Sequence, residues 1–340
     1  MKKKAINVIK ILFFLGLGIL LVWLALRDKT EKQISDIVES IKQANYFWLI
    51  LSVVISGLSH YFRAVRWKML LEPLHHKPKT YNTFFAVMVG YLANFAIHRI
   101  GEVTRCGLLT KYEKVPFTEG FGSVIAERAF DMVCLILIFF LTFAIELDKI
   151  SGIANDLIFK NVAVKWHALM QNQFLLIAML VVFVALLGVF FYFRVKIKQL
   201  ISGKILGFAK GIWQGLLSIK NVKKPFFFIL QTCVIWLLYI LQVYVCFFAF
   251  PETAHLSFVV AMVIVVFGSI GIIAVPGGTG AYQLIVIQIL MTVYSITEAP
   301  ANAFAWAVWV SQFIMILAVG SLSLVLLPIF NKETQKTNVL

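Results

Sequence analysis

The chain is organised around a polar stretch that reads Asn94-Phe-Ala-Ile-His98-Arg99-Ile-Gly101-Glu102-Val-Thr104-Arg105. A second polar cluster follows within the first turns of a long apolar segment and reads Glu127-Arg128-Ala-Phe-Asp131. Charged side chains near or within a bilayer are costly, and those that occur there usually serve a function. We therefore treat these two clusters as the candidate site and the rest of the chain as the scaffold around it.

The composition indicates a membrane protein. Of 340 residues, 61% are hydrophobic and only 14% are charged. Several apolar runs reach the roughly 20 residues that a helix needs to cross a bilayer. The runs are continuous rather than alternating, which excludes a β-barrel. We predict an all-α, polytopic transmembrane helical bundle with re-entrant or broken hairpins, built as a single integral-membrane domain over residues 1–340.

The hydrophobic pattern divides the chain into nine apolar segments. We expect about six to eight transmembrane helices, together with one or two re-entrant segments. Segment 84–97 is too short to cross a bilayer as a helix. The predicted segments are 6–26, 47–62, 84–97, 121–145, 174–193, 225–250, 258–275, 281–294 and 302–327.

The distribution of lysine and arginine predicts the orientation. These residues concentrate at the N-terminus, in the connections 63–79, 99–114 and 194–224, and in the C-terminal tail. Cytoplasmic loops carry such an excess, so both termini are expected in the cytoplasm. Because the connections on both sides of 84–97 are cationic, this segment should enter the membrane and return to the same side.

A second hairpin is expected from the outer side. Segments 258–275 and 281–294 are flanked by connections that contain no lysine or arginine. Whether the tip between them stops in the bilayer or spans it stays open. Two opposed broken hairpins are the arrangement with which many transporters build a substrate site near the bilayer midplane.

The tip of the second hairpin carries its own signal. It reads Pro276-Gly277-Gly278-Thr279-Gly280, followed by Tyr282. Glycine permits a tight reversal and the close approach of a helix or a ligand. The loop is therefore either a simple turn or part of the substrate site, with Tyr282 as a polar contact. It lacks the Lys-Ser/Thr pair of a phosphate-binding P-loop.

The charged clusters support two interpretations. In the first, ions neutralise one another so that helices can dock, with Arg99 and Glu102, or Arg128 and Asp131, at i, i+3 spacing. In the second, the cluster binds a lipid headgroup, because arginine suits bidentate contact with phosphate. The predicted site residues are Asn94, His98, Arg99, Glu102, Arg105, Glu127, Arg128 and Asp131, with the tip residues Pro276, Gly277, Gly278, Gly280 and Tyr282.

Two cationic stretches are predicted at the membrane surface. Arg63, Arg66 and Trp67 end an apolar segment in the manner of interfacial anchors. The connection 194–224 carries eight Lys or Arg residues and an apolar stripe at helical spacing. It is either an amphipathic helix on an anionic leaflet or ordinary cytoplasmic charge.

The sequence lacks the common catalytic and metal-binding motifs. There is no His-Glu-x-x-His, Gly-x-Ser-x-Gly or Cys-x-x-Cys pattern, and the four cysteines are scattered. We therefore expect no metal and no cofactor, and regard enzymatic activity as unsupported. The positive charge lies in membrane-flanking loops, so the expected partners are membrane lipids and not nucleic acid.

Four motifs occur in an order that resembles one membrane family. They are Arg63-x-x-Arg66-Trp67, Arg99-x-Gly101-Glu102-x-x-Arg105, Glu127-Arg128-x-x-Asp131 and Pro276-Gly277-Gly278-x-Gly280. Together they resemble the lysylphosphatidylglycerol synthase transmembrane region, a flippase-like family. The resemblance implies a domain that flips aminoacylated phosphatidylglycerol, while a separate cytoplasmic domain synthesises that lipid. The sequence offers no room for such a synthase domain, so a separate lipid-synthesising enzyme is an expected partner.

The sequence thus predicts a lipid flippase or lipid transporter of a bacterial inner membrane. The substrate would be a phospholipid or a lipid-linked headgroup. One alternative is a membrane-embedded aminoacyl or glycosyl transferase that uses Glu127 or Asp131 as a base. The other is a subunit that scaffolds an envelope-lipid assembly without transporting anything.

Overall fold

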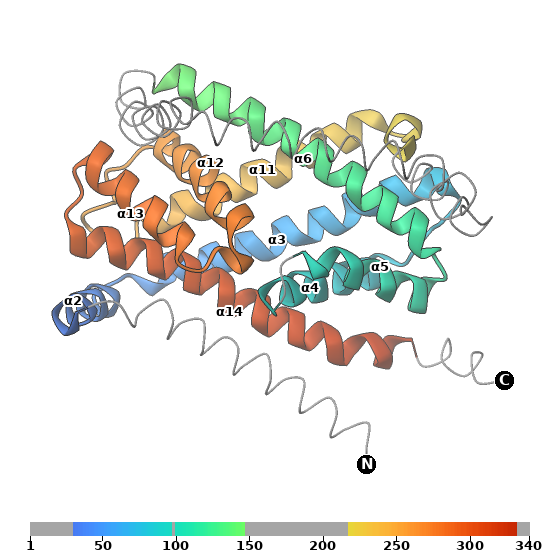
Figure 1. The fold of residues 1–340 in the computed structure, drawn as a ribbon, viewed down its shortest axis with the longest axis horizontal. Helices are drawn as coiled ribbons and strands as arrows, with labels where there is room; N and C mark the ends of the chain where they lie inside the picture. The colour runs from blue at the N-terminus through green and yellow to red at the C-terminus, as the bar shows by residue number, and fades with distance from the viewer. Residues whose placement is uncertain (1–29, 97–98, 147–216, 332–340) are drawn as a thin grey trace, which may run out of the picture.

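The computed structural model describes residues 30–96, 99–146 and 217–331, and every regular element within them is helical (Figure 1). The predicted all-α class is confirmed. The predicted segments 6–26 and 174–193 lie outside the described residues, as does all of the cationic stretch 194–224 except 217–224.

Among the described residues, four helices are long and apolar enough to cross a membrane. The shortest, with 23 residues, is about 34 Å long at 1.5 Å per residue, which exceeds the hydrocarbon thickness of about 30 Å. The chain is therefore a multi-pass membrane protein. The four are α3 (Tyr46–Leu71), α6 (Phe117–Ile145), α11 (Pro225–Phe247) and α14 (Glu298–Phe330).

Helices α3 and α11 lie antiparallel at the centre of the molecule (Figure 1). The Asn45 side chain caps α3 by accepting a hydrogen bond from the Phe47 N–H, and its own N–H donates to the Ala249 carbonyl just after α11. Pro225 occupies the first turn of α11, where its missing N–H has no partner to lose. The amphipathic helix α2 (Glu31–Lys42) precedes α3 and contacts α14.

The first hairpin consists of α4 (Thr80–Ala96) and α5 (Ile100–Glu113). The two helices pack closely at Gly101. A Cβ at this position would lie 2.6 Å from Asn94 Oδ1, so only glycine fits there. The sequence predicted a single re-entrant segment over 84–97 followed by a cytoplasmic connection over 99–114. The structure corrects this: the return limb is itself a helix, so Arg99 and Arg105 belong to the hairpin.

The second hairpin consists of α12 (Phe258–Ala274), a short turn η4 (Pro276–Gly278) and α13 (Ala281–Tyr294). Three glycines at its tip have φ values of +63°, +72° and +79°, a region that L-residues with side chains rarely adopt. Neither limb alone has the length of a typical transmembrane helix. The polypeptide therefore reverses direction inside the bundle.

The two hairpins enter the bundle from opposite ends and meet at their tips. Figure 1 shows α4 and α5 in its right-hand part and α12 and α13 in its left-hand part. At the meeting point a Cβ on Gly277 would collide with the Phe95 ring. Trp309 of α14 donates to the Gly277 carbonyl at 2.9 Å, and its ring contacts Phe95 edge-on. The two hairpins are therefore opposed within the bundle, and their entry from opposite faces of the membrane stays a prediction.

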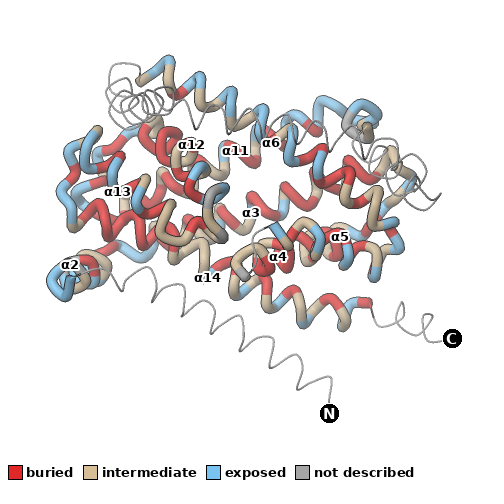
Figure 2. The backbone as a smooth tube through the Cα atoms, in the orientation of Figure 1, coloured by how far each residue is buried: buried red, intermediate tan, exposed pale blue. Residues whose placement is uncertain are grey.

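Burial follows the faces along which the helices meet. Figure 2 shows buried residues along α3 and along the inner face of α14, whereas α2 and much of α6 are exposed. The side chains of Leu137 and Phe140 on α6 are each 62% exposed with respect to the described residues. Exposed apolar side chains on a long helix suit contact with lipid chains, since lipid replaces water as the solvent there.

Candidate functional site

Helix α3 buries its two arginines. Arg63 is 3% exposed, and Arg66 and Trp67 are fully buried, with the Trp67 indole donating to Ser123 Oγ at 2.9 Å. The sequence predicted these three residues as interfacial anchors, whereas the structure shows their side chains packed inside the bundle and not on its surface. The helix continues to Leu71, so the stretch lies within a packed helix rather than at its end.

Three arginines surround two carboxylates in the interior. Arg63 contacts Glu127 at 3.0 Å and Asp131 at 2.7 Å, and Arg66 contacts the same two carboxylates at 3.3 and 2.6 Å. Arg105 contacts the other oxygen of Glu127 at 2.9 Å. We call these five residues the buried cluster; it joins α3, α5 and α6. It holds one more positive than negative charge.

Hydrogen bonds and aromatic rings complete the buried cluster. Arg63 Nε donates to the Tyr239 hydroxyl at 3.1 Å, and Arg66 donates to Thr232 Oγ1 at 3.2 Å, which links the cluster to α11. The Arg105 guanidinium lies 4.6 Å from the centroid of the Trp67 ring. Ionised groups can be buried only when they are paired and hydrogen-bonded, so this cluster also docks four helices.

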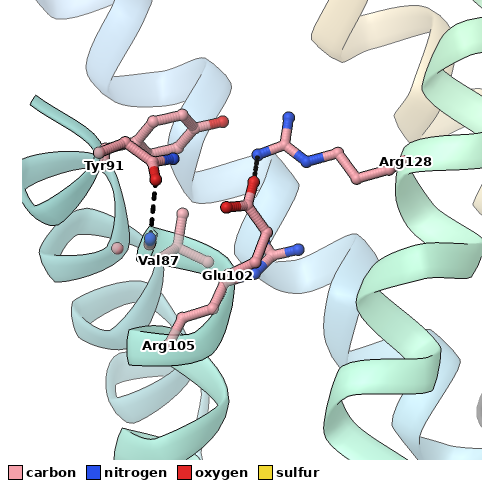
Figure 3. Close-up of a pocket in the computed structure, with 8 residues that line it drawn as sticks. Val87, Tyr91, Glu102, Arg105 and Arg128 are labelled. Carbon is pink, nitrogen blue, oxygen red and sulfur yellow. Dashed lines mark hydrogen bonds and ion pairs between the residues drawn. The ribbon is translucent and has the colours of Figure 1, made fainter. Parts of the chain in front are cut away.

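A second ion pair lies beside the cluster and nearer the surface. Arg128 of α6 donates to Glu102 of α5 at 2.8 Å, with side-chain exposures of 42% and 18% (Figure 3). Figure 3 also shows Arg105 below this pair, at a small pocket of about 10 Å³ whose lining includes Asn94 and Glu102. The Asn94 side chain accepts from the Gly101 N–H at 2.7 Å and so closes the turn of the hairpin.

The ion pairs recorded for these residues run between helices. The i, i+3 spacing of the sequence suggested that Arg128 pairs with Asp131, but Arg128 contacts Glu102, and Asp131 contacts Arg63 and Arg66. Arg99 begins α5 with a left-handed backbone (φ 61°) and is exposed. His98 lies outside the described residues.

A large cavity opens beside the charged groups. It measures about 710 Å³ and is bounded by all four long helices, α12 and the tips of both hairpins. Its walls are largely apolar, with a few polar and charged side chains. This size and mixture are typical of a small-molecule or headgroup site.

The predicted site residues divide between the cavity wall and its surroundings. Arg105 and Glu127 are not among the lining residues and belong to the buried cluster behind the wall. Of the tip residues, Gly278 and Gly280 do not line the cavity either. The predicted residues on the wall are Asn94, Arg99, Glu102, Arg128, Asp131, Gly277 and Tyr282.

Several polar residues on the wall were not predicted from the sequence. The signal for them was weak, because each is a single polar residue within an apolar helix, such as Gln242 in α11 and Gln312 in α14. They are Ser56, His60, Tyr91, Trp236, Tyr239, Gln242, Ser269 and Gln312; Arg63 also lines the cavity but was predicted as an interfacial residue. Within the described ranges, no three or more His, Cys, Asp or Glu residues are placed to hold a metal ion.

The fold and site define a polytopic helical membrane protein with a largely apolar cavity that contains a few charged and polar side chains, between two opposed hairpins. The sequence model of the family described as the lysylphosphatidylglycerol synthase TM region matches residues 7–320, and the chain belongs to this family.

Among curated proteins, the chain is similar to a UPF0104 membrane protein of Methanocaldococcus jannaschii. The two are 26% identical over 122 residues, which is 35% of this chain and 36% of that protein. The chain thus matches about a third of the relative's length. No solved structure matches the chain at a significant level.

Proposed function

We propose that the protein carries a lipid headgroup between the two leaflets of a bacterial inner membrane, with both termini in the cytoplasm. The headgroup would enter the cavity between the hairpin tips, while the acyl or isoprenoid chain stays in the surrounding lipid. A polar headgroup meets a large free-energy barrier in bare hydrocarbon, and a polar cavity lowers this barrier.

The cavity is the observation that carries this proposal. It places Arg63, Arg99, Arg128, Glu102 and Asp131 on the wall of a space of about 710 Å³ inside an apolar helical bundle. Opposed hairpins that meet near the middle are also the architecture with which transporters form such a site. The family's description names a lysylphosphatidylglycerol synthase region, which agrees with a lipid substrate.

The geometry suggests different roles for the buried cluster and for the Arg128–Glu102 pair. The buried cluster holds helices together, since its five side chains are almost fully enclosed. The Arg128–Glu102 pair is partly exposed and lies on the cavity wall, so it can exchange one partner for a headgroup phosphate. Substitutions in this pair should therefore affect transport more than folding.

The test combines folding and transport in one set of variants. The wild type and the double variant Arg128→Gln with Glu102→Gln are reconstituted in vesicles that contain aminoacyl, anionic or polyprenyl-linked lipids. Lipid movement is measured with a leaflet-resolved assay, and thermal stability is measured in detergent.

We expect the double variant to keep its unfolding temperature within a few degrees, because an exposed ion pair contributes only about 0–1 kcal/mol. Its lipid movement should fall to the rate of protein-free vesicles. A folded double variant with wild-type transport would show that the pair is structural and would remove it from the site. Absence of transport by the wild type for every lipid class would refute the proposed function.

A further inference from the structure

Glu102 has one carboxylate oxygen that is paired and one that is not. The first accepts from Arg128 at 2.8 Å. The second, Oε2, is buried and has no hydrogen-bond partner within the part of the chain that the structure describes. A buried polar atom in a native protein nearly always has a partner, so this oxygen indicates that something else binds there. A carboxylate oxygen gains such a partner when it takes up a proton, because it then becomes a donor.

The other two carboxylates near the cavity are engaged at both oxygens. Glu127 contacts three arginines and Asp131 contacts two. If either of them lost one arginine, another would remain. Glu102 has one ion pair among the described residues, so the loss of Arg128 would leave its charge without a counterion.

A pocket of about 10 Å³ lies beside Glu102 and suits both protonation states of its carboxyl group (Figure 3). This volume is about enough for one water molecule. Arg105 lines the same pocket, is 3% exposed, and has a buried Nε without a partner among the described residues. A single water here would accept from Arg105 Nε. It would donate to Oε2 of the ionised Glu102 and accept from the protonated form.

Arg128 links this carboxyl group to the large cavity. Its side chain is 42% exposed and lines the cavity, so an anion can reach it. A guanidinium keeps its proton, so Arg128 stays positive whichever partner it has. When Arg128 pairs with an anion instead of Glu102, two negative groups lie beside one positive group. Like charges at close range favour the neutral form of an acid, so Glu102 should then bind a proton.

Other charged and titratable groups surround this pair on every helix that packs against it. Arg63 and Arg105 are already paired within the buried cluster, so Arg128 is the neighbouring cation whose ion-pair partner can change. The groups are Arg99, Arg105 and Cys106 on α5, Tyr91 on α4, Glu127, Arg128 and Asp131 on α6, and Arg63 on α3.

We propose that Glu102 is a proton-binding site linked to anion binding at Arg128, so that one proton enters the site with each anion. The proton comes from bulk water and adds to the carboxylate as the Arg128–Glu102 pair opens. It returns to bulk water when the anion leaves and the pair forms again. A proton and a monovalent anion would then cross the bilayer without net charge, and the membrane potential would not oppose their movement. This rests on the proposed function for its lipid anion, but proton uptake is measured by binding alone.

The test counts the protons taken up when an anion binds the purified full-length chain in detergent. The probe is dihexanoyl phosphatidylglycerol, a short-chain phosphodiester whose own charge is constant near neutral pH. Isothermal titration calorimetry in buffers of different ionisation enthalpy gives the number of protons taken up per bound lipid. We expect uptake that approaches one proton per lipid. Where a whole proton is taken up, the affinity should fall about tenfold for each unit of rising pH.

Two single variants locate the proton. Glu102→Gln cannot ionise, so it should bind the lipid at least as tightly as the wild type and take up no proton. Glu119→Gln is the matched control, because Glu119 is also partly exposed and also has one ion pair, with His76 at 2.7 Å, but lines neither pocket. It should take up the wild-type number of protons.

Three results would overturn the inference. The first is lipid binding by the wild type without proton uptake, and the second is a wild type that does not bind the phosphodiester; neither needs a variant to fold. The third is wild-type proton uptake in Glu102→Gln. Proton-linked binding without lipid movement in vesicles would uphold the inference and refute the proposed transport. Lipid movement without proton-linked binding would do the opposite, so the two failures are distinguishable.

Discussion

At the scale of single residues, the balance of charges determines which side chain of the buried cluster contributes most to the stability of the fold. Glu127 is fully buried and accepts from Arg63, Arg66 and Arg105. Loss of Arg63 would leave two arginines opposite two carboxylates. Loss of the Glu127 charge would leave three arginines opposite Asp131 alone. The carboxylate is therefore the more sensitive member of the cluster.

We predict that Glu127→Gln destabilises the fold by about 3–5 kcal/mol, because uncompensated buried charge is among the costliest defects in a protein. Glu102→Gln makes the same chemical change in the more exposed Arg128 pair and should cost no more than about 1 kcal/mol. Thermal or denaturant unfolding in detergent measures both. Equal stabilities for the two variants would contradict the structural role given to the buried cluster.

At the scale of elements, the contact between α4 and α5 depends on a glycine in each helix. A Cβ on Gly90 would lie 2.9 Å from the Gly101 carbonyl, and one on Gly101 would strike both Gly90 and Asn94. Close backbone approach of this kind is how small residues bring membrane helices together. From α5, Glu102 and Arg105 contact Arg128 and Glu127 on the neighbouring helix α6.

We predict that Gly101→Ala separates the hairpin limbs and lowers stability by about 1–3 kcal/mol, as overpacking does elsewhere. Gly107→Ala is its control: it lies on the same helix, and nothing lies within 4 Å of the position its Cβ would take. Alanine there should stabilise the helix by up to about 1 kcal/mol. If both substitutions had the same sign in an unfolding experiment, the hairpin packing described here would be incorrect.

At the scale of the whole molecule, the hairpins have opposite points of entry. The base of the α4–α5 hairpin lies at the end of the bundle where Asn82 pairs with Asn331, just after α14. The base of the α12–α13 hairpin lies at the other end, close to the start of α14 (Figure 1). The cavity therefore lies between two hairpin tips that enter the bundle from opposite ends (Figure 1).

We predict that the bases of the two hairpins lie on opposite sides of the membrane. The test labels single cysteines introduced into a chain whose four native cysteines are replaced by alanine. Probes at the exposed positions Lys77 and Lys111 should both react from the cytoplasmic side. Probes at the exposed positions Glu252 and Thr297 should both react from the opposite side. Reaction of Lys77 and Lys111 from different sides would mean that the first hairpin spans the membrane.

The helical class, the membrane location and the opposed hairpins follow from the sequence because they depend on local properties. Long apolar runs need no tertiary contact to predict a membrane helix, and a glycine-rich break predicts a reversal wherever it occurs. The short segment 84–97 between two cationic connections was enough to indicate a hairpin. Its second limb was missed, because the charges of α5 resembled those of a cytoplasmic loop.

Only the tertiary structure determined the partners of the charged residues. Spacing along a helix predicted pairs within one element, whereas the structure joins Arg63 to Glu127 and Asp131, 64 and 68 residues away. It also shows that Arg63 and Arg66, which were predicted as interfacial residues, are buried inside the bundle. His60, Gln242 and Gln312, from three different helices, line one cavity. Periodicity reports which face of a helix is polar, but the element opposite that face is set by packing between distant segments.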